Sequence, residues 1–200
     1  GPPVTGWTRR MPRAARPLIQ TLRSFLRARQ GATAVEFAFI AGPLLMLIFG
    51  VLELAMVFMV ATTLEGATAA AARPLRTGEM QTSGTANKTE FTKAVCARMS
   101  WLGATCADNL QVDVRTYDDF TSLRDDPAMT GGNFNPAQTC WSPGGPTDIV
   151  LVRTYYSWSI FTPLLSKALV NAPGDKRLVS AVEAFRNEPY SDAPPTKANC

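Results

Sequence analysis

The order of apolar and polar residues divides the chain into one long apolar segment and a later region of shorter patterns. From Phe37 to Leu64, a stretch of 28 residues, Glu53 is the only charged residue. As a helix this stretch would be about 42 Å long, against the roughly 30 Å of a bilayer core. The part that reads "PLLMLIFGVLELAMVFMV" has no polar stripe at helical period, so the helix should face lipid or other helices. We therefore predict one membrane span.

The flanking sequence gives this span its expected bounds. Residues 1–31 are rich in Arg and Pro and are predicted to form a basic cytoplasmic leader. The helix is expected over 32–73, because Ala-rich sequence extends it beyond the bilayer until Pro74 makes continuation costly. Residues 74–88 read as a polar, Gly-containing linker, and 89–200 as one compact periplasmic domain.

The compact region begins with a helical pattern and continues with alternating ones. Phe91, Val95 and Met99 lie at helical spacing, and Thr89 is a candidate N-cap. A strand is predicted over 110–117, with Val112 and Val114 on one face and Asp113 and Arg115 on the other. A long loop rich in Gly, Pro, Asn and Asp follows. The remaining pattern predicts a strand, a helix and a strand, over residues 147–159, 161–170 and 177–188.

This order of elements predicts an α+β fold: a long N-terminal membrane helix and a small domain with an antiparallel sheet packed on a helix. About three strands are expected, with the first helix of the domain across one face. The 112 residues of this region are enough for one small core.

Charge is distributed unevenly, and this orients the span. The formal net charge is +4, yet residues 1–30 hold seven arginines and no acid, so the sequence pI near 9.0 reflects the N-terminal tail. Because the arginines precede the apolar run, the positive-inside rule places the N-terminus in the cytoplasm. The same position favours membrane lipid over nucleic acid as the partner of the basic tail.

The four cysteines all follow the span, on the side predicted to be oxidising. The chain has no histidine and no Cys-x-x-Cys pair, so structural disulfides are favoured over a metal site, and no cofactor is expected. Three pairings are possible. We favour Cys96 with Cys106, which closes a short loop, and Cys140 with Cys200, which would hold the C-terminal tail.

A glycine at the cytoplasmic edge of the span points to a processing event. Gly31 offers an unhindered peptide bond, and Glu36 follows five residues later. Cleavage after Gly31 would give Ala32 a charged amino terminus at the lipid edge, where the Glu36 carboxylate of a neighbouring subunit could pair with it. Alternatively, Glu36 only lies at the interface, near a helix N-terminus that favours a carboxylate.

The segment "GATAVEFAFIAGPLLMLIFGVLELAMVF" resembles the TadE-like family of pseudopilins, from the Tad (tight adherence) pilus system. The family pattern is a basic leader, a glycine, four residues, a glutamate, an aromatic residue and an apolar helix. Gly31, Glu36 and Phe37 fit this pattern, although Tad pilins often have tyrosine after the glutamate. A second glutamate late in the helix is typical too, and here it is Glu53. The resemblance covers about a fifth of the chain.

The resemblance implies cleavage by a prepilin peptidase between Gly31 and Ala32, and a role as a minor, pilin-like subunit in assembly of an adhesion pilus. The implied partners are the peptidase, other Tad minor pseudopilins, the major Flp pilin and the inner-membrane assembly platform. Ala34, Ala38 and Gly42 form a row of small residues that would let helices approach closely, although ordinary alanine content also explains it.

Glu53 is the less expected carboxylate, because a charge deep in a span costs about 2.5–3.5 kcal/mol on insertion scales. It lies about 100° around the helix from Glu36, so the two cannot form one acid/base or metal pair. Glu53 either bonds a partner helix or lies near the periplasmic interface.

Enzymatic function is not expected. Without histidine a conventional catalytic triad is excluded, and no phosphate loop or EF-hand spacing is present. Two alternatives to the processed pseudopilin remain: an uncleaved membrane-anchored periplasmic adaptor, and a secreted binding module or enzyme released at "ATAAAA". We expect the paired acids of the loop on its solvated surface; they are Asp118, Asp119, Asp125 and Asp126. We expect the aromatic residues of the domain in either the core or a contact surface; they are Trp101, Trp141, Trp158, Tyr155 and Tyr156.

Overall fold

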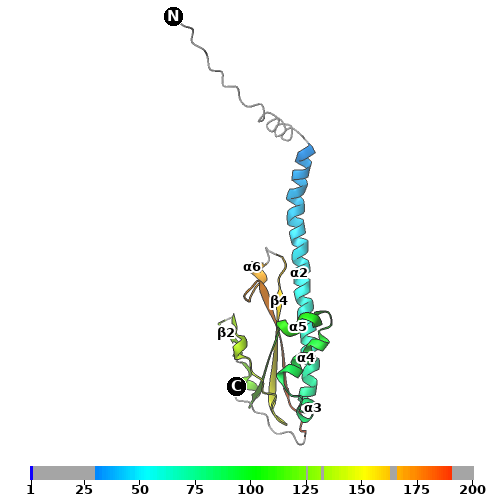
Figure 1. Cartoon of the computed structure of the whole chain (residues 1–200), viewed down its shortest axis with the longest axis vertical. Helices are drawn as coiled ribbons and strands as arrows, with labels where there is room; N and C mark the ends of the chain where they lie inside the picture. The colour runs from blue at the N-terminus through cyan, green and yellow to red at the C-terminus, as the bar shows by residue number, and fades with distance from the viewer. Residues whose placement is uncertain (2–29, 125, 132, 163–165, 191–200) are drawn as a thin grey trace. The chain divides into compact units, whose positions relative to one another are not determined.

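The longest element of the protein is helix α2, Gln30–Arg76 (Figure 1). The chain forms two compact units, residues 1–49 and residues 50–200. The computed structural model describes residues 1, 30–124, 126–131, 133–162 and 166–190. Most of the predicted basic leader, residues 2–29, therefore lies outside the described residues.

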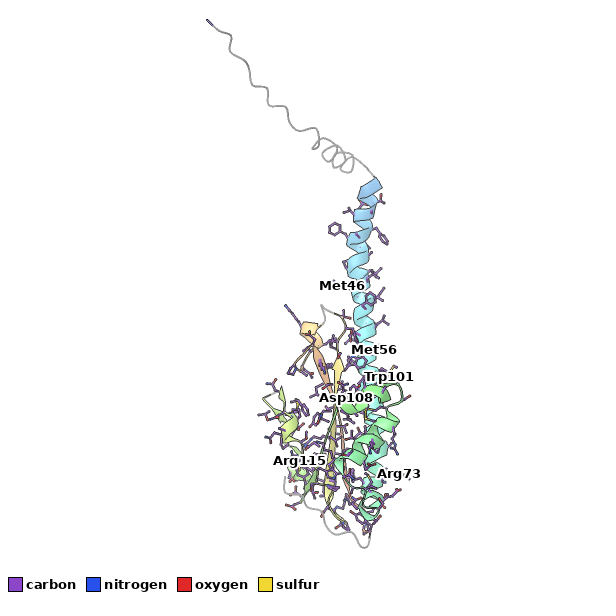
Figure 2. The ribbon with its side chains drawn as sticks, in the orientation of Figure 1. Met46, Met56, Arg73, Trp101, Asp108 and Arg115 are labelled. Carbon is purple, nitrogen blue, oxygen red and sulfur yellow. A yellow bond between two sulfur atoms is a disulfide. The ribbon has the colours of Figure 1, made fainter. Side chains whose placement is uncertain are left out.

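The first unit contains the N-terminal part of α2, whose large apolar side chains are exposed. Met46, for example, stands out from the helix and is 50% exposed (Figure 2). Among the described residues one helix is long and apolar enough to cross a membrane, and it is this one. An apolar surface of this size fits a single-pass membrane protein, because it has no favourable place in water.

The second unit is built on a three-stranded antiparallel sheet. Its strands are β1 (Leu110–Tyr117), β4 (Ile149–Ser159) and β5 (Lys176–Arg186), in the order β1-β4-β5. The register sets Val114 opposite Val152, and Val152 opposite Glu183. The C-terminal part of α2 packs on one face together with α4 (Lys88–Arg98) and α5 (Gly103–Asn109) (Figure 1). The predicted α+β fold is confirmed.

The core lies between α2 and the inner face of the sheet. Every fourth residue or so of α2 contributes to it: Val60, Leu64, Ala67, Ala71 and Leu75. These residues meet apolar side chains from the helices and strands, namely Phe91, Val95, Met99, Leu110, Val112, Val114, Val150, Val152, Tyr156, Val179 and Ala181. The apolar side of α2 beyond the predicted membrane span is therefore the side that packs on the sheet.

One polar contact lies inside this apolar interface. Thr68 of α2 and Thr154 of β4 are both fully buried, and their hydroxyl oxygens are 2.7 Å apart, a hydrogen bond in which either can donate. Because the interface excludes water, each hydroxyl depends on the other for a partner. The bond therefore fixes the rotation of α2 against the sheet.

Replacing Thr68 with valine is expected to destabilise the second unit by about 1–3 kcal/mol, because it leaves the Thr154 hydroxyl buried without a partner. The double variant Thr68→Val/Thr154→Val should recover most of that loss, since two apolar groups of the same shape replace the bonded pair. Urea unfolding of the full chain in detergent, followed by tryptophan fluorescence, measures both. A double variant as unstable as the sum of the single variants would contradict this role.

Short elements connect the main ones. They are the helices α3 (Glu79–Thr82) and α6 (Ser166–Leu169), the 3-10 helices η2 (Ser100–Leu102), η3 (Phe120–Arg124) and η4 (Pro136–Gln138), and a small hairpin of β2 (Met129–Thr130) and β3 (Asn133–Phe134). The predicted linker thus contains one helical turn, α3. Within the predicted helix over 161–170, α6 is helical, and residues 163–165 lie outside the described residues.

The first helix of the domain begins earlier than the sequence pattern predicts. Asn87, and not Thr89, is the N-cap of α4, since its side chain accepts a hydrogen bond from the backbone N–H of Glu90. A disulfide joins Cys96 of α4 to Cys106 of α5, the pairing that the sequence favours. It ties the short α5 to α4, on the helical layer over the sheet. Cys200 lies outside the described residues, so the pairing of Cys140 with Cys200 stays a prediction.

Candidate functional site

The predicted processing site lies in the first turn of α2. The helix begins at Gln30, so the bond between Gly31 and Ala32 is part of this turn. The first four N–H groups of a helix have no partner within it, which makes the turn inexpensive to unwind. A side chain added at Gly31 would meet nothing within 4 Å. Among the residues that the structure describes, none encloses the bond.

The residues after the glycine form an open apolar surface with one carboxylate in it. Glu36 is exposed, and no ion pair to it is present among the described residues. Phe37 beside it is 72% exposed. A carboxylate in such surroundings gains from a positive charge brought by another molecule, because lipid offers it none.

Two of the three predicted small residues border a shallow apolar hollow on the helix. Its lining consists of Gly31, Ala34, Val35, Ala38 and Phe39. Gly42, the third member of the row, lies one turn further on, and a side chain added there would also meet nothing within 4 Å. Gly31, Ala34 and Ala38 contribute little side-chain bulk to the lining of this hollow. Its shape would accept a side chain of a second helix.

Glu53 lies where the folded unit begins, and it is bound by the chain itself. Only 6% of the residue is exposed. Its Oε2 atom accepts hydrogen bonds from the backbone N–H groups of Phe161 and Thr162, both at 3.1 Å, and from the Thr162 hydroxyl at 3.0 Å. Such bonds to a carboxylate are stronger than bonds between neutral groups, and they offset the cost of burying the charge.

The contacts of Glu53 follow a helix segment whose length matches the thickness of a bilayer core. From Thr33 to Leu52 the helix has 20 residues, about 30 Å, which is the thickness of a bilayer core. Beyond Leu52 the folded unit covers one side of the helix, beginning with the Glu53 bonds and continuing with Val60 and Leu64, which are fully buried. The other side stays open, and Phe58 is 71% exposed. These contacts favour the interface position for Glu53; the bond to a partner helix stays a hypothesis.

Replacing Glu53 with alanine is expected to destabilise the junction by about 1–3 kcal/mol, because two part-buried N–H groups lose their acceptor. Replacement with glutamine, which keeps an acceptor oxygen, should cost about 1–2 kcal/mol. Hydrogen exchange at the Phe161 and Thr162 amides of the full chain measures the local loss. Glu65→Ala is the matched control, since Glu65 is an exposed glutamate of the same helix. Unchanged exchange in Glu53→Ala would refute the assigned contact.

A second buried polar cluster lies on the other face of the sheet. Asp113 of β1 is fully buried and sits opposite Arg153 of β4 in the register. Its carboxylate pairs with Arg115 Nε at 3.0 Å and with Arg153 Nη1 at 3.6 Å, and it accepts the backbone N–H of Cys140 at 2.7 Å. The pattern of β1 places Asp113 correctly on the polar face, but it does not predict that this face is covered.

The long loop provides the cover. Asp126 of this loop accepts from the Tyr155 hydroxyl at 2.8 Å, and its carboxylate lies 3.9 Å from Arg153 Nε. Phe134 packs on the Tyr155 ring with centroids 4.6 Å apart. Burial, and then the hydrogen bond to Asp126, raise the pKa of the Tyr155 phenol above its ordinary value, so the phenol remains a donor. The cluster thus ties the loop to the sheet and is structural in character.

A lysine of the helical layer also interacts electrostatically with this cluster. Lys88, at the start of α4, donates to the Thr139 hydroxyl at 2.8 Å. Burial lowers the pKa of its ammonium group from the usual value, and the Asp113 carboxylate opposes that shift. Among the described residues no group of three or more metal-ligating side chains is present.

The other singled-out residues divide between the core and the surface. Asp118 and Asp119 are exposed as expected, whereas Asp126 takes part in the buried cluster; Asp125 lies outside the described residues. Tyr155 and Tyr156 are buried. Trp141 packs against Phe91 and donates to the Ala86 carbonyl, and Trp101 stacks edge-on with Trp158.

Comparison with known proteins gives one family match, and it covers the helix that carries this candidate site. The family model described as "TadE-like protein" matches residues 31–73, which begin at the candidate glycine and end within α2. The resemblance seen in the sequence is thereby confirmed over these residues. No curated protein matches the chain, and no solved structure matches it. The match suggests a protein associated with the Tad pilus.

Proposed function

We propose that the protein is a minor, pilin-like subunit in assembly of a Tad/Flp-type adhesion pilus, and that a prepilin peptidase matures it by cutting after Gly31. The observation that carries the proposal is the family match, whose first residue is Gly31 and whose range includes both glutamates. The open surroundings of Gly31 and the exposed carboxylate of Glu36 support it.

Cleavage would give the Glu36 carboxylate a cationic partner. Cleavage would leave Ala32 with an α-ammonium group at the edge of the lipid. In a bundle of such helices, the Glu36 carboxylate of one subunit would pair with the ammonium group of the next, and each charge would offset the burial cost of the other. The hollow beside Ala34 and Ala38 would let the two helices approach closely enough for this pairing.

The location follows from the same elements. We propose a single span of the bacterial inner membrane, with the arginine-rich N-terminus in the cytoplasm and the sheet domain in the periplasm. The proposed partners are the prepilin peptidase, the other minor pseudopilins, the major Flp pilin and the assembly platform.

An uncleaved, membrane-anchored adaptor is the alternative. It is favoured by one observation: the bond after Gly31 lies within α2, and a peptidase would have to unwind the first turn to reach it. The helix end makes that unwinding inexpensive, so the observation does not outweigh the family match.

Filament counts in cells test the proposed role. In cells that lack the chain, filaments should be absent in electron micrographs, and the wild-type chain should restore them. A Glu36→Gln chain should restore fewer filaments, because a neutral side chain cannot pair with an ammonium group. Glu65→Gln, which changes an exposed glutamate later in the same helix, should restore them fully. Normal filament numbers without the chain would refute the role.

A further inference from the structure

The end of the domain that carries the Glu53 contacts also exposes aromatic and cationic side chains. Phe161, whose backbone binds Glu53, is 73% exposed. Its ring stacks edge-on with Trp158 at 5.8 Å, and Trp158 in turn with Trp101 at 5.9 Å. Trp101 is 43% exposed. Three aromatic rings therefore form a row that ends at the residue bound to Glu53.

Cations border the same end of the domain. Lys167 of α6 is exposed, and Lys176 begins β5. Arg177 follows it, and its guanidinium donates to the Leu169 carbonyl at 2.9 Å, which fixes α6 beside β5. Asp175 is the one acid in the sequence from Ile160 to Arg177, so this connection carries a net charge of two positive units.

A groove joins this connection to α2 within the same unit. It is lined by Leu54, Val57, Phe58 and Ala61 of the helix, and by Leu169, Arg177, Val179 and Ser180. The lining places α6 and the start of β5 beside the helix turn that follows Glu53. A membrane span from Thr33 to Leu52 would end next to Glu53 and would put this part of the domain at the membrane surface.

We propose that this membrane-proximal rim, defined as Trp101, Trp158, Phe161, Lys167 and Lys176, docks on the anionic phospholipid headgroups of the leaflet next to the domain. Aromatic side chains favour the boundary between headgroups and hydrocarbon, and lysines near it are attracted to anionic lipid. The proposal relies only on the membrane span, and it holds whether or not the leader is cleaved or a filament forms.

The Glu53 bonds would support docking of the rim. The bonds hold the backbone of Phe161 to the helix, so that the ring stays at the height of the headgroups. The domain would then be held against the membrane at two points, the helix and the rim.

Lysine footprinting in nanodiscs tests the docking. The full chain is placed in discs of phosphatidylcholine, with or without a third of the lipid replaced by phosphatidylglycerol, and is treated with a water-soluble acylating reagent. Acylation of Lys167 and Lys176 should be slower by about five-fold in the anionic discs, which corresponds to about 1 kcal/mol for each lysine. Lys93, exposed on α4, is the internal control for the reagent and should not change.

Two variants separate the aromatic contribution from general effects. Phe161→Ser should remove most of the protection of the two lysines, while its backbone still binds Glu53. Val182→Ser, which changes a 56% exposed side chain of β5, should leave the protection intact. Equal acylation rates in the two kinds of disc, or equal slowing at Lys93, would overturn the proposal. Protection that survives Phe161→Ser would overturn the role of the aromatic rim.

Discussion

Replacing Gly31 with leucine is expected to leave the chain at full length and to prevent filament assembly. A peptidase that cuts after this residue must bring its catalytic groups close to the peptide bond, and a branched side chain obstructs that approach. The change should not disturb the helix, because the space around Gly31 is open and leucine is a good helix former. An immunoblot of membranes should show a single band that retains the leader.

Gly42→Leu is the matched control, because Gly42 is in the same helix and its surroundings are equally open. This variant should be processed like the wild type, although it could pack less well against a neighbouring helix. A Gly31→Leu chain of the same length as the mature wild-type protein would contradict the assigned cleavage site. Full-length bands in both variants would indicate that leucine anywhere in this part of the helix blocks recognition by the peptidase.

The largest expected loss of stability comes from Asp113→Ala. The substitution leaves the buried guanidinium of Arg153 and the half-buried one of Arg115 without their shared carboxylate, and the Cys140 N–H without its acceptor. Removing one member of a buried ionic cluster typically costs about 3–5 kcal/mol, because the remaining charge is uncompensated. We expect that loss in the free energy of unfolding, with release of the long loop from the sheet.

Urea unfolding of the full chain in detergent measures the effect, and Asp108→Ala is its control. Asp108 is exposed in the last turn of α5 (Figure 2), so its loss should change stability by less than about 0.5 kcal/mol. Asp113→Asn should be intermediate, since the amide oxygen can still accept the Cys140 N–H. A loss below about 1 kcal/mol in Asp113→Ala would show that the cluster is not what holds the loop.

The elements with a strong local pattern could be predicted from the sequence. The apolar run became α2, and the alternation around Val112 and Val114 became β1. The apolar segment around Val150 and Val152 became the central strand β4, which needs apolar residues on both faces because both are covered. In each case hydrophobic periodicity determines the element, and periodicity is a local property of the chain.

The contacts between distant segments could not be predicted in the same way. Glu53 is bound by residues more than one hundred positions later, and no feature of its own neighbourhood indicates them. The burial of Asp113 depends on how a loop of irregular sequence folds back over the sheet. A charged residue, Arg153, inside an apolar strand was the available signal that this face holds a buried ion pair.

Local chemistry also decided smaller features that periodicity does not determine. Both Asn87 and Thr89 can cap a helix, and Asn87 does so because its backbone is extended and its side chain reaches the Glu90 N–H. The helix α5 has little apolar pattern, and it is held by the disulfide to α4 and by the burial of Cys106. Tertiary contacts thus define elements that a single-sequence pattern leaves open.

The N-terminal residue of the wild-type protein, identified by mass spectrometry of membranes, tests the central claim most directly. The account predicts Ala32 as the terminus in cells that have the prepilin peptidase, and the intact leader in cells that lack it. A protein that keeps its leader in both would contradict the claim and favour the uncleaved anchor. A terminus near Arg73 would mean that the helix is a discarded signal, and would contradict the account as a whole.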